Sequence, residues 1–369
     1  NGRSLPCERF RADVASRSSM FSYDESALRA LLTARAPTTI AEMPGGASTR
    51  RYFRVDCTEG DRKSVVAMFV PDGDKPEEIG KHTGFRRWPF LEVRDLLAER
   101  GVAVPEILVE SSERGYLVLD DLGDDTLAQF LLREPQRKRE VYTLAVEGLA
   151  RAQVALSALP EDSIVRTRSF DLDLLHWEIQ HFREWGVEAR GLAFSESDHA
   201  IFEGIATRLA ARIAAFPQIF VHRDYQSRNL MVRGAEDGSL TLLWIDFQDA
   251  LLGPRVYDLV ALLGDSYQEF DRAFIEARLD EYAAVAGLPS EARAALGREF
   301  DYVTVQRKLK DAGRFIFIDK KKGNPAFLKF FLPTLAKVRG ALARLGEDPY
   351  MVALDAVLRR TLGAEYTES

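Results

Sequence analysis

Two acidic side chains and one amide stand at spacings that suit phosphoryl transfer. His222-Arg223-Asp224 is followed, after four residues, by Asn229, and Asp246 comes further along the chain. The first spacing matches the catalytic-loop pattern H-R-D-x-x-x-x-N, and Asp246 stands where the metal-binding aspartate of a D-F-G motif would stand. We expect Asp224 to orient and deprotonate the attacking hydroxyl. We expect Asn229 and Asp246 to hold Mg²⁺ against the phosphates of ATP.

Three apolar runs must position these side chains. Ile219–Val221 and Leu230–Val232 flank the polar loop, and Leu240–Ile245 ends directly before Asp246. Short strands of this kind would present the three groups to one cleft. The alternative is a chance match, in which His-Arg-Asp closes a strand and Asp246 is a cap or turn residue. Three spaced matches in the right strand context favour the catalytic interpretation.

Longer stretches around these residues resemble a known superfamily. Asp224–Asn229 and Trp244–Leu263 are similar to the aminoglycoside phosphotransferase and choline kinase superfamily. Within it, Gly46–Arg54, Gly115–Gly123 and Gln306–Lys310 resemble bacterial kinases that phosphorylate the anomeric hydroxyl of N-acetylmuramate and N-acetylglucosamine. The resemblance therefore extends over most of the chain.

This resemblance implies an α+β, bilobal protein-kinase-like fold with a small antiparallel β lobe that carries one helix and a larger, mostly helical lobe. Residues 20–121 would form the nucleotide-binding lobe, and residues 122–369 the catalytic and substrate lobe. Residues 1–19 are expected to be an extended start or an expression remnant. The implied function is an ATP- and Mg²⁺-dependent sugar kinase of the cytoplasm that acts in peptidoglycan recycling on a small-molecule amino sugar.

The resemblance also implies roles for individual residues. Main-chain groups of Asp120 and Leu122 would hold the adenine ring at the hinge between the lobes. Asp258 would brace the catalytic loop through its backbone amides, with His222 as a further structural support. The alternative for Asp258 is an ordinary acid in the first turn of a helix, where the macrodipole favours it. Glu178 would contact the substrate.

A glycine-containing turn near the start of the resemblance is expected to cover the nucleotide phosphates. Gly45 and Gly46 permit close approach of the backbone, and Ser48 offers an amide and a hydroxyl to phosphate oxygens. Taken alone, the stretch is more typical of a plain hairpin turn. The downstream catalytic loop favours the phosphate-binding interpretation.

The lysine that usually follows on the next strand is missing, because Met68 and Phe69 occupy the positions where V-A-I-K would place it. Arg51 or Arg54 on the preceding strand could supply the lost positive charge, since guanidinium binds phosphate in a bidentate fork. The alternative is that both arginines are solvated residues on the face of the strand.

The stretch from Arg307 to Gly323 concentrates positive charge in an acidic chain. Such a run is most often a solvated helix face. N-acetylmuramate carries a carboxylate, however, and a nearby cation would distinguish it from neutral amino sugars. Arg307 and Lys310 are the candidates for this contact.

Composition excludes several other classes of protein. A net charge of −7 argues against a general nucleic-acid binder. The two cysteines, Cys7 and Cys57, form neither a disulfide framework nor a zinc spacing, which is typical of a reducing cytoplasm. No apolar run approaches the length that a membrane span needs. The sequence makes no prediction of the oligomeric state.

Three other functions stay open on the sequence. The acceptor could be an aminoglycoside, choline or another small alcohol, such as a homoserine-like compound. The missing lysine at Met68 and Phe69 is compatible with a catalytically silent nucleotide-binding protein, although the intact Asp224, Asn229 and Asp246 argue against it. A protein kinase is least favoured, because no glycine follows Asp246-Phe247 and no Ala-Pro-Glu stretch comes after it.

Overall fold

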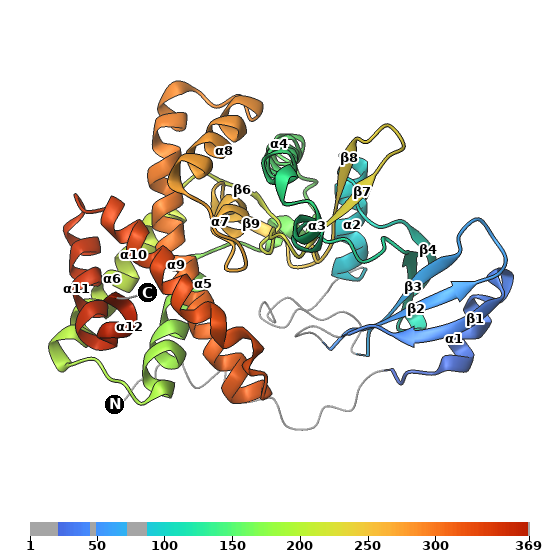
Figure 1. Cartoon of the computed structure of the whole chain (residues 1–369), viewed down its shortest axis with the longest axis horizontal. Coiled ribbons are helices and arrows are strands. Elements are labelled where there is room, and N and C mark those ends of the chain that lie inside the picture. The colour runs from blue at the N-terminus through green and yellow to red at the C-terminus, as the bar shows by residue number, and fades with distance from the viewer. Residues whose placement is uncertain (1–20, 45–48, 72–86, 368–369) are drawn as a thin grey trace. The chain divides into compact units, whose positions relative to one another are not determined.

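A computed structural model describes residues 21–44, 49–71 and 87–367, and it mixes helices with antiparallel strands (Figure 1). The helices and strands, in chain order, are α1 (Glu25–Leu31), β1 (Pro37–Glu42), β2 (Arg51–Cys57), β3 (Ser64–Phe69), α2 (Pro89–Glu99), β4 (Ile107–Ser111), β5 (Tyr116–Asp120), α3 (Leu127–Arg133), α4 (Lys138–Ala155), α5 (Leu172–His181), α6 (Glu196–Ala214), β6 (Gln218–Val221), β7 (Leu230–Gly234), β8 (Leu240–Trp244), β9 (Leu251–Pro254), α7 (Tyr257–Leu263), α8 (Arg272–Val285), α9 (Ser290–Lys322), α10 (Phe331–Arg344), α11 (Pro349–Leu362) and α12 (Ala364–Thr367). Short 3-10 and π turns join several of them. The predicted α+β composition is confirmed.

The described residues divide into two compact units. The first contains those up to Pro89 together with Pro105–Asp121, and the second contains Phe90–Val104 and the chain from Leu122 onward. Helix α2 therefore packs with the second unit, although the sequence on both sides of it belongs to the first. The predicted lobe boundary after residue 121 stays a prediction.

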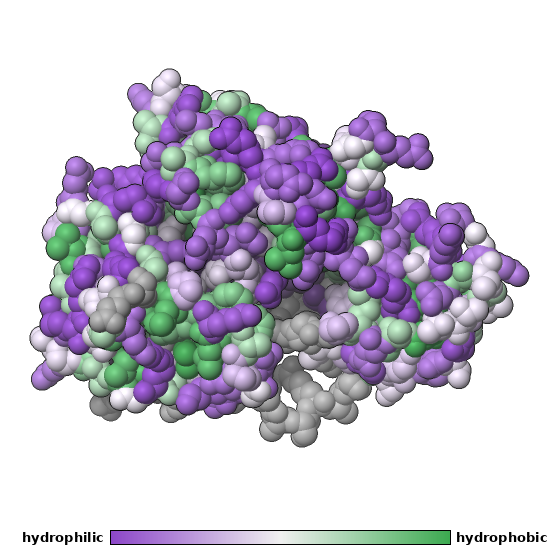
Figure 2. All heavy atoms as spheres, in the orientation of Figure 1, coloured by the Kyte–Doolittle hydropathy of each residue, from purple (hydrophilic) through white to green (hydrophobic). Residues whose placement is uncertain are grey.

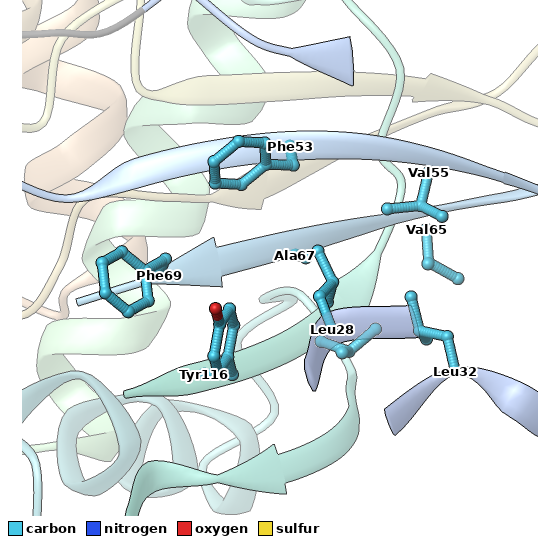
Figure 3. Packing of buried hydrophobic residues seen from close by; sticks show 9 residues of the cluster. Leu28, Leu32, Phe53, Val55, Val65, Ala67, Phe69 and Tyr116 are labelled. Carbon is cyan, nitrogen blue, oxygen red and sulfur yellow. The ribbon is translucent and has the colours of Figure 1, made fainter. Parts of the chain in front are cut away.

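The first unit is a five-stranded sheet in the order β1-β2-β3-β5-β4, antiparallel throughout. Helix α1 begins at an N-cap, where the Asp24 side chain accepts a hydrogen bond from the Ser26 amide at 2.8 Å. Its Leu28 and Leu32 pack onto one face of the sheet against Phe53 and other apolar side chains (Figure 3). This burial of apolar surface holds helix and sheet together.

Strand alternation decides which residue stands in place of the missing lysine. Arg51 pairs with Phe69 and Tyr52 with Met68 in the β2–β3 ladder. Because neighbouring side chains point to opposite faces, Phe69 lies with Phe53 in the core cluster that Leu28 and Leu32 of α1 also join, as Figure 3 shows. Met68 is on the other face. Met68 therefore stands at the position where the strand lysine is missing, and Phe69 is a core residue.

The second unit contains two small hairpin-like pairs and most of the helices. β6 pairs with β9, and β7 pairs with β8, all antiparallel. The three apolar runs predicted around the polar loop are therefore strands β6, β7 and β8, as expected. Helix α9, the long orange helix of Figure 1, packs against both α5 and α10.

Hydrophilic side chains dominate the face drawn in Figure 2, with apolar residues scattered among them. Within the described part of the chain, no helix combines the length and apolar composition that crossing a bilayer requires.

Candidate active site

Asn229 ties the polar loop to the residue that follows strand β8. Its Nδ2 donates to the Asp224 carbonyl at 2.8 Å and lies 3.4 Å from Asp246 Oδ2. The Ile245 amide donates in turn to the Asn229 carbonyl at 3.1 Å. We expected these three side chains to meet, and the structure brings the Asn229 side chain into contact with the Asp224 main chain and the Asp246 carboxylate.

Two residues of this site hold unusual backbone conformations. Arg223 has φ of 79° and Asp246 has φ of 63°, in the left-handed region that side chains other than glycine rarely adopt. Such conformations cost on the order of 1–3 kcal/mol each and persist only where the surroundings enforce them. One of these two residues precedes the predicted base, and the other is the predicted metal ligand. Strain at such positions is typical of a functional site.

Asp258, in the first turn of α7, supplies part of that enforcement. Its Oδ2 accepts from the His222 amide at 2.7 Å and its Oδ1 from the Arg223 amide at 3.0 Å. These are the contacts that the predicted brace requires. Burial raises the pKa of Asp258 to about 7, and the two backbone hydrogen bonds act in the opposite direction.

His222 links the catalytic loop to the end of strand β8. Its Nε2 lies 3.0 Å from the Ile245 carbonyl, which can only accept, so Nε2 carries the proton. Burial lowers the pKa of His222 to about 4, so the ring is neutral at physiological pH. A neutral, fully buried histidine that joins two backbone segments fits the predicted structural role.

The carboxyl group of Asp224 is kept ionised by cations around it. Burial acts to raise its pKa, but Arg307, Lys310 and Arg223 outweigh that effect and hold the pKa below its ordinary value. Arg307 Nη2 lies 3.4 Å from Asp224 Oδ1, and the Asp224 side chain is 37% exposed. An ionised, accessible carboxylate can accept a hydrogen bond from an acceptor hydroxyl.

The two cations predicted on α9 occupy different positions. Arg307 is buried, donates to the Arg223 carbonyl at 2.8 Å and lies over the Tyr257 ring. Lys310 is the more exposed of the two, with its Nζ 3.7 Å from Asp311 Oδ1. Arg307 therefore supports the catalytic loop, and Lys310 is better placed than Arg307 to meet an acceptor.

Glu178 is fully buried in this structure. Gln306 donates to its Oε2 at 2.7 Å, and its Oε1 faces Arg223 at 3.8 Å and Lys310 at 4.0 Å. A carboxylate in this position compensates two cations, which burial would otherwise penalise. The predicted substrate contact of Glu178 stays a prediction, and the contacts seen favour an indirect role through Lys310.

Gln248 and Arg168 belong to the site but were not predicted. Gln248 stands where D-F-G has glycine, and its Nε2 donates to Asp246 Oδ1 at 2.9 Å and to Asp249 Oδ2 at 3.2 Å. The buried Arg168 donates to the Gln248 carbonyl at 2.8 Å. The glutamine in place of glycine was the available signal for the first, whereas nothing in the local sequence marks Arg168.

The two arginines of β2 lie on opposite faces of the sheet. Arg51 is on the face opposite Met68, where it pairs with Glu42 at 2.7 Å and lies over the Tyr23 ring. Arg51 is therefore not placed to replace a side chain at Met68. Arg54 is on the same face as Met68, but its guanidinium makes a two-point contact with Asp121 at 2.8 and 3.1 Å.

The remaining nucleotide-binding predictions concern Gly45, Gly46, Ser48, Asp120 and Leu122, and the structure tests none of them. Gly45, Gly46 and Ser48 lie outside the described residues. The Asp120 amide donates to the Glu106 carbonyl at 3.0 Å, and the Asp120 side chain accepts from the Glu106 amide at 2.7 Å. Leu122 is half-buried. The adenine contact of Asp120 and Leu122 stays a prediction.

The oxygen donors near β8 fit a magnesium ion carried with a nucleotide. Across residues 21–44, 49–71 and 87–367, no three His, Cys, Asp or Glu side chains gather into a metal-binding group. Mg²⁺ is usually held by only one or two carboxylates, with phosphate and water oxygens completing its shell. Asp246 is exposed, and Asn229 donates through Nδ2, which leaves its Oδ1 as the ligating atom. This pair suits such an ion.

Comparison with known proteins agrees with this chemistry. Residues 39–296 match the sequence profile of the phosphotransferase enzyme family. Over 312 residues, the chain is 34% identical to an N-acetylmuramate/N-acetylglucosamine kinase of Pseudomonas putida, which covers 82% of this chain and 84% of that protein.

Solved structures show the same fold at low sequence identity. A choline kinase from Cryptosporidium parvum is similar with a TM-score of 0.57 at 12% identity, over 89% of this chain and 99% of that one. An ADP-bound aminoglycoside phosphotransferase is similar with a TM-score of 0.53 at 16% identity, over 85% and 98%. These likenesses confirm the predicted protein-kinase-like fold, and the chain belongs to the phosphotransferase enzyme family.

Proposed function

We propose that this phosphotransferase uses ATP and Mg²⁺ to phosphorylate the anomeric hydroxyl of N-acetylmuramate and N-acetylglucosamine. The observation that carries the proposal is Asn229, whose one amide group joins the loop of Asp224 to Asp246. The relative from Pseudomonas putida, which bears that enzyme name, supports the acceptor class. A place in the recycling of cell-wall amino sugars, in the cytoplasm, follows from the same acceptor.

When bound, Mg²⁺–ATP supplies the phosphoryl group and the charge neutralisation that its transfer needs. Asp246 and Asn229 would hold the metal ion. Asp224 accepts the hydrogen bond of the acceptor hydroxyl, orients its oxygen and takes its proton as the bond to phosphorus forms. Arg307 keeps Asp224 ionised and fixes the Arg223 carbonyl, so the base stays in place.

Charge near the base bears on the choice of acceptor. Lys310 is partly exposed, and Glu178 and Asp311 lie beside it. We place the carboxylate of N-acetylmuramate against Lys310, because an ammonium group binds a carboxylate as a point charge. An aminoglycoside or choline is cationic and would meet Lys310 at the same position, so these acceptors are disfavoured.

The test is ATP turnover by wild-type enzyme and Asp224→Asn with both amino sugars, choline and an aminoglycoside, with the phosphate position read by NMR. We expect an anomeric phosphate from the amino sugars. In Asp224→Asn, kcat should fall by roughly 10²–10⁴-fold while nucleotide binding persists, since general-base catalysis contributes about that much.

Asp237→Asn is the matched control. Asp237 is an exposed residue in the connection between β7 and β8, where it caps the Ser239 amide at 2.9 Å, and it should leave kcat unchanged. Full activity of Asp224→Asn would refute the assigned base. Phosphorylation of choline or the aminoglycoside in preference to amino sugars would refute the acceptor.

A further inference from the structure

A second buried aspartate contacts the catalytic loop from the other side. Asp265 follows α7 and is fully buried. Its Oδ2 accepts from the Ser227 amide at 3.1 Å and from the Ser227 hydroxyl at 2.5 Å, and its Oδ1 accepts from the Tyr267 amide at 3.0 Å. Ser227 is itself fully buried and lies between Asp224 and Asn229 in the loop.

Helix α7 thus carries one aspartate near each end of the loop. Asp258, in its first turn, holds the amides of His222 and Arg223, before the base. Asp265, just beyond its last turn, holds Ser227, after the base. A short helix is stiff along its axis, so the two carboxyl groups act as fixed points. Between them they set the position of the segment that contains Asp224.

The segment that carries Asp265 is itself anchored to α10. Lys337 donates its Nζ to the Asp265 carbonyl and, at 2.8 Å, to the Gln268 carbonyl. Thr334 donates to the Ser266 hydroxyl at 2.9 Å. Gly264 is packed so closely that a Cβ there would lie 2.7 Å from the Val260 carbonyl oxygen. Asp265 is therefore held from behind by backbone and side-chain contacts.

We propose that Asp265 is a positioning residue for phosphoryl transfer, which acts through Ser227 on the spacing between Asp224 and Asn229. The inference rests on the proposed function of these two residues. The Ser227 carbonyl also accepts from the Ala128 amide at 3.0 Å, so each polar group of Ser227 has a partner that fixes the loop. Loss of the Asp265 contact would let the base and the metal ligand drift apart.

We expect a displacement of Asp224 relative to Asn229 to lower kcat. Displacement of catalytic groups by about 1 Å costs on the order of a hundredfold in rate. We expect Asp265→Asn to lower kcat about a hundredfold, because an amide offers one acceptor oxygen where Ser227 and Tyr267 need two. Ser227→Ala removes the hydroxyl contact but keeps the amide contact, so we expect about a tenfold loss, the size of one hydrogen bond to a charged group. KM for both substrates should change little.

Three measurements separate positioning from loss of fold. In the Asp224→Asn background, Asp265→Asn should cause no further loss of kcat, because residues that act as a unit are non-additive. Hydrogen exchange of residues 222–229 should be faster in Asp265→Asn. Asp301→Asn is the control, because Asp301 is a buried aspartate that pairs with Arg272 and Arg344, none of which contacts the catalytic loop. It should leave kcat per folded molecule and exchange in the loop unchanged.

Each contrary result overturns the inference. Asp265→Asn with kcat near wild type, with unchanged exchange in the loop, or with the same further loss in the Asp224→Asn background would show that Asp265 does not position the base. Failure of the proposed function would look different, because wild-type enzyme would then not phosphorylate amino sugars. The exchange measurement needs no acceptor, so it tests the Asp265 contact in that case too.

Discussion

Replacement of Arg307 by glutamine should move the pH dependence of kcat. Arg307 is 2% exposed, and its guanidinium both donates to the Arg223 carbonyl and lies 3.4 Å from Asp224 Oδ1. Glutamine is shorter than arginine and carries no charge, but it retains an amide donor. The substitution therefore removes the cation beside the base and keeps a polar group in the buried space.

The size of the effect follows from that distance. Two unit charges 3.4 Å apart interact by ~5 kcal/mol at an effective dielectric constant of about 20 and by ~1 kcal/mol at that of water. Asp224 is 37% exposed, so the value lies between these limits. Removal of Arg307 takes this attraction away and therefore raises the pKa of Asp224.

The direction of the shift is fixed by the role of the base. Protonated Asp224 cannot take the proton of the acceptor, so kcat falls on acidification through its pKa. Arg307 also lowers the pKa of Asp258, and both aspartates therefore titrate at higher pH in Arg307→Gln. The acid limb of the kcat profile must move to higher pH.

The assay is kcat from ADP release at saturating substrates, between about pH 3 and about pH 9. Arg298→Gln is the control on the same helix, because Arg298 contacts Glu347 and Tyr302, which lie outside the catalytic loop. It should keep the wild-type profile. An acid limb that stays in place in Arg307→Gln, whatever the absolute rate, would refute the electrostatic reasoning and leave Arg307 only its contact with the Arg223 carbonyl.

Three further predictions concern single contacts. Asp258, with its pKa raised by burial to about 7, contributes stability that is complete below about pH 3.9 and is lost as pH rises through about 7. It also adds its own acid limb near pH 7 to kcat, separate from the limb of Asp224 at lower pH, because a protonated carboxyl cannot accept both amides. Asp258→Asn should abolish the limb near pH 7 in a pH–rate profile, and its persistence would exclude Asp258 as the titrating group. Lys310→Met should reduce the preference for N-acetylmuramate over N-acetylglucosamine by roughly tenfold in kcat/KM, and an unchanged ratio would contradict the contact. Arg255→Met should lower the unfolding free energy by ~3–5 kcal/mol, because it leaves the buried Glu299 without the arginine that contacts it at 2.7 and 2.8 Å. Denaturant melts would show most of that loss restored when Glu299→Leu is added. No restoration would argue against the pair.

The catalytic loop was predictable because its chemistry depends on local spacing. Asp224 and Asn229 are separated by one turn of loop between two strands, and Asp246 directly follows a third strand. Strand patterns and motif spacing are recognised within short windows, so the strands were predicted correctly, and the roles of the three residues between and after them stay predictions. The sequence located the position of the missing lysine only to within one residue, at Met68 or Phe69. Both candidates were apolar, and the packing of α1 on the sheet decides between them.

The positions of charged residues on α9 were not predictable in the same way. A run that contains Arg307, Lys308 and Lys310 is typical of a solvated face, yet Arg307 and Lys308 are buried. Burial of Lys308 is compensated by Asp311 on the same helix. Glu178, which lies beside Lys310, comes from a helix far away in the sequence. Only the tertiary fold brings α5 and α9 together.

The same reasoning explains why Arg54 is a weaker candidate for a phosphate anchor than its sequence position suggests. Arg54 lies on the face of Met68, but Asp121 accepts two hydrogen bonds from its guanidinium and another from the Ser64 hydroxyl at 2.8 Å. To bind a phosphate, Arg54 would have to give up a carboxylate that is mostly buried, which would leave that carboxylate uncompensated. The stronger expectation is therefore that Asp121 and Arg54 fix the end of β5 as a pair, and that the positive charge missing at Met68 is supplied from elsewhere.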